Sequence, residues 1–254
     1  RCGVAEELAP PFAGAEVSDD GAPRELHRPT QSLVELDLDR ATRRGYPEAV
    51  LAGSKTLDQL LHIAHEVVER DAPTLFTRVR PEHVEPLRAA LPGALLDADA
   101  SLLAWPGEPP TPTGGKVVVL AAGTSDVPVA SEAATTARHL GREVELVVDV
   151  GVAGLHRVLG RLELIRSARA IVVVAGMDGA LPGVVAGLVP APVVAVPTSV
   201  GYGIGGEGVA ALYSMLQTCA PGLAVVNIDN GIGGGAMAAL IANRAARARL
   251  GEGV

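Results

Sequence analysis

From residue 116 onward, the chain alternates short apolar runs with longer segments of helical periodicity. The runs over 116–122 (KVVVLAA), 144–148, 170–175, 192–196 and 223–228 are apolar at nearly every position. Strands that are apolar on both faces are typical of a parallel sheet covered by helices on both sides. The sequence therefore predicts an α/β domain with a five-stranded, flavodoxin-like or Rossmann-like three-layer arrangement.

A proline- and glycine-rich stretch over 106–115 (PGEPPTPTGG) is typical of a linker and separates this domain, 116–254, from an upstream region. Residues 31–105 are predicted to form a small α/β domain. Apolar residues recur at helical spacing over 56–70, a short strand is expected over 73–78, and a helix that begins with proline is expected over 81–90. Residues 1–30 are predicted to be a flexible leader.

Charge is distributed unevenly along the chain. Residues 1–112 hold 19 acidic and 11 basic side chains, whereas residues 113–254 hold ten of each. Residues 170–243 contain no lysine or arginine and only three acidic residues, Asp178, Glu207 and Asp229. A soluble domain needs a charged surface, so we expect part of this stretch to be covered by another subunit of a homo-oligomer.

The overall composition excludes several classes of protein. A net charge of −8 and an aromatic content of 2% argue against nucleic-acid binding and against an anionic membrane surface. No apolar run is long enough for a transmembrane helix, and no signal peptide is recognisable. Two cysteines give neither a disulfide framework nor a zinc site, so the cytoplasm is the expected compartment.

Ligands of parallel sheets bind at the carboxyl ends of the strands, and polar residues follow each predicted strand. The loop Gly123, Thr124, Ser125 and Asp126 precedes a predicted helix and offers backbone N–H groups and hydroxyls to an anion. The same residues are also good helix caps, so the pattern alone leaves both roles open.

The next loops carry the other candidates. His156 suits proton transfer and Arg157 suits phosphate or carboxylate binding. A lone His and Arg at a helix start are more often structural, but their position at the carboxyl end of a strand, between glycines, favours a functional role. Gly176, Met177 and Asp178 follow the third strand, where Asp178 suits a metal, a substrate or a helix cap. Thr198, Ser199 and Gly201 follow the fourth, in a glycine-rich loop that offers backbone N–H groups to a ligand or is simply a surface loop.

Cys219 follows the helix predicted over 207–218. A free cysteine near a helix end is usually a small buried apolar residue, and the negative end of the helix dipole disfavours a thiolate. Spacing alone therefore leaves a nucleophilic role for Cys219 as the less common alternative.

The segments GTSD at 123–126, GLHR at 154–157, LPG at 181–183 and PVVAVP at 192–197 resemble aminoimidazole ribonucleotide (AIR) carboxylases. A sister family, the pyridinium-3,5-biscarboxylic acid mononucleotide synthases (LarB), is more similar. Its resemblance rests on segments 149–157, 176–180 and 197–203, and further on 37–40, 43–48, 53–56 and 225–231.

The LarB resemblance implies an enzyme of nickel-pincer nucleotide synthesis, which serves lactate racemase maturation. Such an enzyme carboxylates C5 of the pyridinium ring of nicotinic acid adenine dinucleotide with CO2 and hydrolyses the phosphoanhydride, which releases AMP. The resemblance also implies covalent catalysis, with Cys219 adding transiently to C4 of the ring and His156 transferring protons. It further implies a homo-oligomer, with an octamer as the expected form.

The resemblance assigns the remaining polar residues to substrate and metal. The residues implied in substrate binding are Gly123, Thr124, Ser125, Asp126, Arg157, Gly176, Met177, Thr198, Ser199 and Gly201. Asp178 is implied as a catalytic residue that holds Mg²⁺ or orients the attacking water. No biotin apparatus is recognisable in the sequence, so CO2 is expected to be used directly, and no bound nickel is expected. Two alternatives stay open: an AIR carboxylase or mutase of purine synthesis, and a non-catalytic nucleotide-binding module.

Overall fold

A computed structural model of the chain describes residues 37, 40 and 45–250, with side chains described up to residue 244. The chain divides into two units, 1–33 and 34–254, and every element below belongs to the second. The predicted leader, 1–30, lies outside the described residues.

The carboxyl-terminal half forms a five-stranded parallel sheet, which confirms the predicted α/β fold. Its strand order is β6-β5-β7-β8-β9, and every neighbouring pair is parallel. The strands are β5 (Val117–Ala121), β6 (Val144–Val147), β7 (Ala170–Ala175), β8 (Val193–Pro197) and β9 (Leu223–Val225). The three central strands are buried along their whole length, as their continuous apolar sequence predicts.

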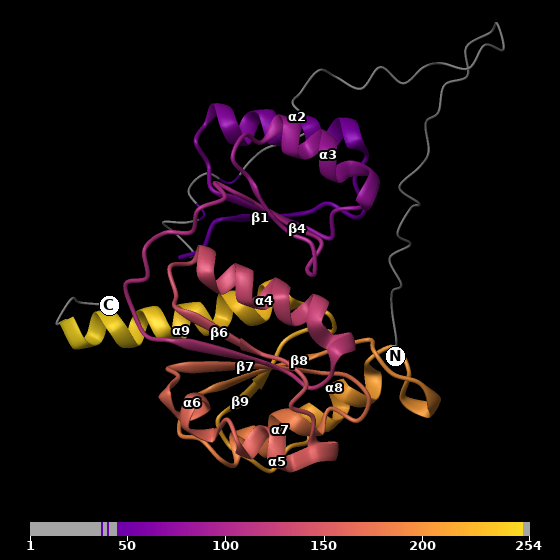
Figure 1. Cartoon of the computed structure of the whole chain (residues 1–254), viewed down its shortest axis with the longest axis vertical. Coiled ribbons are helices and arrows are strands. Elements are labelled where there is room, and N and C mark those ends of the chain that lie inside the picture. Colours follow the sequence, from indigo (N-terminus) through magenta and orange to yellow (C-terminus); the bar gives the residue numbers. More distant parts are fainter. Residues whose placement is uncertain (1–36, 38–39, 41–44, 251–254) are drawn as a thin grey trace, which may run out of the picture. The chain divides into compact units, whose positions relative to one another are not determined.

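Helices cover both faces of this sheet. Figure 1 shows α4 and α9 on one face and the other four helices on the opposite face. The first pair is α4 (Val127–His139) and α9 (Gly231–Leu250); the second group is α5 (Leu155–Leu159), α6 (Leu162–Ser167), α7 (Ala180–Ala186) and α8 (Val209–Leu216). The apolar core is accordingly split into two clusters by the sheet, one on each face.

Helix α9 begins at Gly231, five residues before the predicted start at 236. The glycine-rich sequence indicated a loop, but its first turn is capped from two directions. The Asn230 Oδ1 accepts the N–H of Gly233 at 2.8 Å, and the Glu132 carboxylate on α4 accepts the N–H of Ile232 at 3.2 Å. The predicted helix over 155–167 is also divided, into α5 and α6.

The upstream region forms a four-stranded mixed sheet of order β1-β2-β4-β3, in which β1 and β2 are parallel and the other pairs antiparallel. Its elements are β1 (Glu48–Leu51), α2 (Leu57–Glu69), β2 (Thr74–Thr77), α3 (Pro81–Ala90), β3 (Leu95–Asp97) and β4 (Leu102–Trp105). Both helices and the β2 strand match the prediction. The strands β1, β3 and β4 were not predicted, because three or four residues show no clear periodicity.

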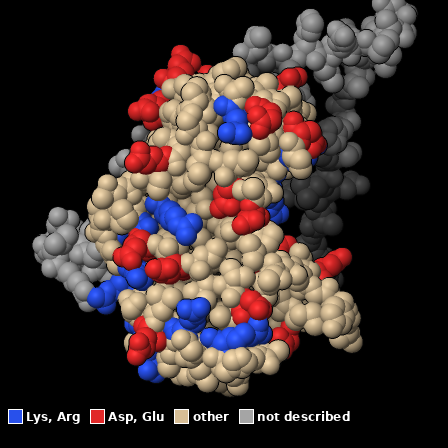
Figure 2. Space-filling view, viewed as in Figure 1, with Lys and Arg blue, Asp and Glu red and all other residues tan. Residues whose placement is uncertain are grey.

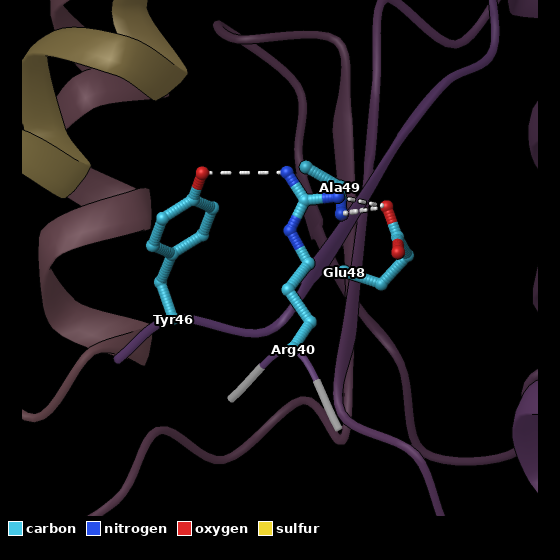
Figure 3. A network of polar contacts seen from close by, with 4 residues as sticks. All are labelled: Arg40, Tyr46, Glu48 and Ala49. Atoms are coloured by element: carbon cyan, nitrogen blue, oxygen red, sulfur yellow. Dashed lines mark hydrogen bonds and ion pairs between the residues drawn. The ribbon is translucent and has the colours of Figure 1, made fainter. Parts of the chain in front are cut away.

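A polar network before β1 explains one of the motifs that resemble LarB. Arg40 donates to Glu48 Oε1 at 2.8 Å and to the Tyr46 hydroxyl at 3.3 Å, and its guanidinium lies 5.0 Å from the Tyr46 ring centre (Figure 3). The hydrogen bond to Tyr46 and the charge of Glu48 raise the pKa of Arg40. The network therefore fixes the start of β1, which is a structural role.

Among the described residues, no helix combines the length and apolar character needed to cross a bilayer.

Candidate functional site

The carboxyl ends of β5, β6 and β7 surround a cavity of about 310 Å³, here called the sheet-end cavity. Three loops that follow these strands form most of its lining. The residues are Ala122, Gly123, Ser125, Asp126, Gly151, Val152, Ala153, Arg157, Ala175, Gly176, Met177, Asp178, Ala180, Leu181 and Val200. Seven of the predicted site residues are thus brought together here: Gly123, Ser125, Asp126, Arg157, Gly176, Met177 and Asp178.

Asp126 is the buried polar centre of this cavity wall. Its Oδ2 accepts the N–H of Gly123 at 2.9 Å, and its Oδ1 accepts the hydroxyl of Thr198 at 2.7 Å. Both side chains are buried, so this contact joins the loop after β5 to the loop after β8. Asp126 and Thr198 therefore hold two loops of the site in place, while Thr124 and Ser125 are exposed in the same turn.

Arg157 is the cation at the cavity. Its Nη1 lies 2.5 Å from Asp149 Oδ2, and the two side chains remain 35% and 53% exposed. A Cβ atom at Gly154 would lie 2.8 Å from Arg157 Nε and 3.2 Å from His156 Cε1, so glycine at 154 lets both side chains lie across the backbone. His156 itself is exposed and lies beside Arg157 rather than in the cavity lining.

Backbone contacts explain the glycine at 176. A Cβ atom there would lie 2.1 Å from the carbonyl oxygen of Val200 and 2.6 Å from Thr198 Oγ1. The following residue, Met177, has a φ of +50°, a backbone conformation that is rare for residues other than glycine. The loop therefore presents Asp178 at the cavity, where its Oδ1 accepts the N–H of Ala180 at 3.4 Å.

Cys219 lies apart from the sheet-end cavity. It is exposed and belongs to the segment that leads from the end of α8 to the start of β9. The N–H of Val193, the first residue of β8, donates to the carbonyl of Gly222, so this segment reaches the amino ends of the strands. The carboxyl end of β8 lies roughly 13 Å from its amino end, at about 3.3 Å per residue of a parallel strand. Cys219 thus does not line the cavity of its own chain.

A second cavity, of about 470 Å³, adjoins the first. We call it the arginine cavity, because Arg78 and Arg80 contribute to it from the loop after β2. The other lining residues are Val79, Pro81, Ala100, Ser101, Ser125, Pro128, Val129, Glu132, Ser199, Val200 and Asp229. Of the predicted site residues, Ser199 lines the arginine cavity. Four others line neither of the two cavities: Thr124, His156, Thr198 and Gly201.

Sequence reasoning missed Glu132, a buried carboxyl group at the arginine cavity. It accepts a hydrogen bond from the Thr77 hydroxyl at the end of β2. Burial raises the pKa of Glu132, and the bonds from Thr77 and from the backbone of Ile232 and Gly231 only partly oppose that shift. A glutamate between two small residues in a helix gives no sequence signal for this role.

The part of the chain that the structure describes has no cluster of three or more His, Cys, Asp or Glu side chains suited to a metal. Mg²⁺ often binds proteins through one or two carboxylates together with the substrate's phosphates. Asp178, exposed at the sheet-end cavity, fits that mode as a single ligand.

The fold and the cavity define an α/β protein with a cavity at the carboxyl ends of its parallel strands. Two family models match consecutive regions, a LarB/PurE-like N-terminal domain over 30–106 and AIR carboxylase over 116–250. The chain therefore belongs to the AIR carboxylase family, whose members are carboxylases and mutases, and it carries the LarB/PurE-like N-terminal domain.

The chain is also similar to individual known proteins. An uncharacterized protein of Methanocaldococcus jannaschii is 37% identical over 245 residues, which cover 91% of this chain and 94% of that protein. The solved structures of Treponema denticola PurE and of a PurE2 variant from the same organism are 25% identical. They match 51% of this chain and 78% of their own chains, with TM-scores of 0.40 and 0.39.

Proposed function

We propose that this protein carboxylates C5 of the pyridinium ring of nicotinic acid adenine dinucleotide with CO2 and hydrolyses the phosphoanhydride, which gives pyridinium-3,5-biscarboxylic acid mononucleotide and AMP. The observation that carries this proposal is the LarB/PurE-like domain over 30–106 on the same chain as the carboxylase domain. That domain and Cys219 are unexpected in a purine-pathway mutase. The product would be a precursor of the nickel-pincer nucleotide.

The reaction requires a nucleophile that is also a good leaving group. A pyridinium carbon is electron-poor and cannot attack CO2. Addition of the Cys219 thiolate at C4 forms a C–S bond and converts the ring to a dihydropyridine whose C5 is an enamine carbon. C5 then attacks CO2 and forms a C–C bond, a base takes the C5 proton, and the C–S bond breaks, which restores the aromatic ring and the thiolate. Water separately cleaves the phosphoanhydride.

The residues at the sheet-end cavity supply the binding groups. Arg157 would hold a phosphate or carboxylate in exchange for Asp149, and Ser125 with the Gly123 backbone would bind a second anionic group. His156, beside Arg157, would move the C5 proton. Asp178 would be the protein ligand of Mg²⁺, which supplies positive charge to the substrate's diphosphate when bound.

The position of Cys219 adds a requirement to this proposal. Since Cys219 does not line the cavity of its own chain, the thiolate at the pyridinium ring would come from a second copy of the chain. The surface of α8 and of the loop that precedes it suits self-association. Tyr202 is 83% exposed and Tyr213 on α8 is 64% exposed, and Glu207 is the only charged residue between β8 and α8. Side chains other than Lys, Arg, Asp and Glu cover most of the described surface on the face in Figure 2. A homo-oligomer, with an octamer as the family form, would bring the two groups together.

Incubation of the protein with nicotinic acid adenine dinucleotide, bicarbonate and Mg²⁺ tests the proposal. We expect AMP release and a mononucleotide product that has gained one carboxylate, measured by mass spectrometry. Cys219→Ala should bind the dinucleotide but lose turnover at least 1,000-fold, as expected for loss of a covalent nucleophile. Cys2→Ala is the matched control for loss of a thiol and should retain activity. Absence of AMP and of the carboxylated product would overturn the proposal.

The AIR carboxylase match over 116–250 also favours a mutase that acts on aminoimidazole ribonucleotide. The same preparation, assayed with carboxylated aminoimidazole ribonucleotide, separates the two activities. A non-catalytic nucleotide-binding module would bind the dinucleotide without turnover in either assay.

A further inference from the structure

Two neighbouring cavities share part of their walls. Ser125 and Val200 line both the sheet-end cavity and the arginine cavity, so a ligand in one can extend past these residues into the other. Their volumes, about 310 and 470 Å³, lie in the range of small-molecule sites. A dinucleotide has a matching form, with two nucleotide halves joined by a diphosphate.

The two exposed arginines are the groups of the arginine cavity that favour an anion, and Arg78 is also attracted to the Glu132 carboxyl group. The two acidic groups of the cavity are engaged within the protein. The Asp229 carboxylate accepts the N–H of Ser199 at 2.8 Å, and the Glu132 carboxylate accepts from Thr77 and from Ile232. The two arginines, in contrast, are exposed at the cavity.

Backbone contacts hold both arginines and leave donors available. Arg78 Nη2 donates to the carbonyl of Asp229 at 2.8 Å, and Arg80 Nη2 donates to the carbonyl of Lys55 at 3.0 Å. A guanidinium has five N–H donors, so these bonds, together with the 3.1 Å contact of Arg80 Nη2 with His83 Nε2, leave other donors available. Arg80 also lies 3.6 Å from Glu82, a pair in which both side chains are about half exposed and which solvent weakens.

Backbone strain is concentrated in the same cavity. Arg78, Ser101 and Asp229 have φ angles of +54°, +49° and +55°, although none of them is glycine. The N–H of Val79 donates to the carbonyl of Ser101 at 2.8 Å, so the two strained turns of the small sheet support one another. Strain of this kind persists where surrounding structure maintains it and is frequent at binding sites.

We propose that the arginine cavity binds the second nucleotide of the substrate, the half that leaves as AMP, with Arg78 and Arg80 on its phosphate. The inference rests on the proposed function for the identity of that half. The nicotinate mononucleotide would occupy the sheet-end cavity, and the diphosphate would pass Ser125. The small domain thereby contributes directly to substrate binding.

Calorimetric titration with two separate probes, AMP and nicotinic acid mononucleotide, tests this inference. The wild-type protein should bind both at once, with the AMP affinity changed less than threefold by saturating mononucleotide. The double variant Arg78→Gln, Arg80→Gln should lower AMP affinity at least tenfold and change mononucleotide affinity less than twofold. Arg157→Gln should show the opposite pattern. Arg88→Gln on α3, an exposed arginine paired with Glu85, is the matched control and should change neither.

A second variant keeps the test independent of the arginines. Ser101→Asp adds a negative charge at the cavity rim, and aspartate tolerates the positive φ better than most residues. It should weaken AMP binding at least threefold and leave mononucleotide binding unchanged. Absence of AMP binding, competition between AMP and the mononucleotide for one site, or unchanged AMP binding in these variants would overturn the inference.

The two proposals fail separately. Turnover of the dinucleotide with competing probes would leave the proposed function in place and remove the second site. Separate binding of both probes without turnover of the dinucleotide would leave the second site in place and remove the proposed function.

Discussion

Buried polar side chains connect parts of the protein that are distant in sequence. Asp126 bridges two strand-end loops, and Glu132 links the end of β2, through Thr77, to the first turn of α9. A buried polar group is costly unless its hydrogen bonds are made, so each of these carboxyl groups strongly favours one arrangement of its surroundings. The site geometry therefore depends on residues that do not themselves contact a ligand.

The raised pKa of Glu132 predicts that the stability of the protein depends on pH. Burial raises the pKa of Glu132 in the folded state above its usual value of 4.5. The folded protein therefore holds this proton more tightly than the unfolded chain. The contribution of Glu132 to stability is fully present below pH 4.5 and is lost as the pH rises through the folded-state pKa. The glutamine of Glu132→Gln cannot ionise, so this variant does not lose that contribution as the pH rises. The unfolding free energy of the variant minus that of the wild type should therefore increase between pH 5 and pH 7.

Urea denaturation at several pH values measures this difference. Glu85→Gln on α3, which replaces an exposed glutamate paired with Arg88, is the matched control. A difference for Glu132→Gln that stays constant or decreases with pH would contradict the assignment.

At the scale of elements, the packing of α9 on α4 determines where glycine is required. A Cβ atom at Gly235 would lie 2.3 Å from the carbonyl oxygen of Ala133 and 3.0 Å from the Thr136 Cβ. At Gly234 the same atom would lie 2.6 Å from Val196 Cγ2 on β8. The glycines thus let α9 approach both its partner helix and the sheet.

Gly235→Ala should consequently destabilise the protein. Alanine favours a helix over glycine by about 1 kcal/mol, but overpacking against a backbone atom costs about 1–3 kcal/mol or more. We expect a net loss of about 1 kcal/mol in the unfolding free energy, measured by urea denaturation. Met237→Ala, on the exposed side of the same helix, should change stability by less than about 0.5 kcal/mol. Equal or greater stability for Gly235→Ala would show that α9 can move away from α4.

Sequence patterns predicted elements best where burial is complete. The buried strands β5, β7 and β8 are unmistakable in the sequence because all their residues are apolar. The first turn of α9 was missed because its glycines are placed by α4, which no local pattern reports. The site shows the same division. Residues of the loops and helix starts that follow the strands, such as Ser125, Arg157 and Asp178, were predicted from topology. Arg78 and Glu132 were not, since only the tertiary contact between the small sheet and α4 gives them a shared cavity.

At the scale of the whole molecule, the separation of Cys219 from the sheet-end cavity has a direct consequence for catalysis. If the thiolate that attacks the ring comes from a second copy, each active site combines two chains. Closed homo-oligomers supply such shared sites through repeated identical interfaces. The exposed apolar residues Tyr202, Ile204, Tyr213 and Leu216 would then lie at or near an interface.

Complementation between two inactive variants tests this arrangement. Cys219→Ala keeps an intact cavity and lacks the nucleophile, whereas Arg157→Gln keeps the nucleophile and damages the cavity. In randomly mixed assemblies, half of the cavities are intact, and half of those face a partner with Cys219. Co-expressed, doubly tagged assemblies should therefore recover about one quarter of wild-type AMP release, because each site draws on two chains. Activity no greater than the sum of the two separate variants would place the nucleophile and the cavity in the same chain, or remove Cys219 from the reaction.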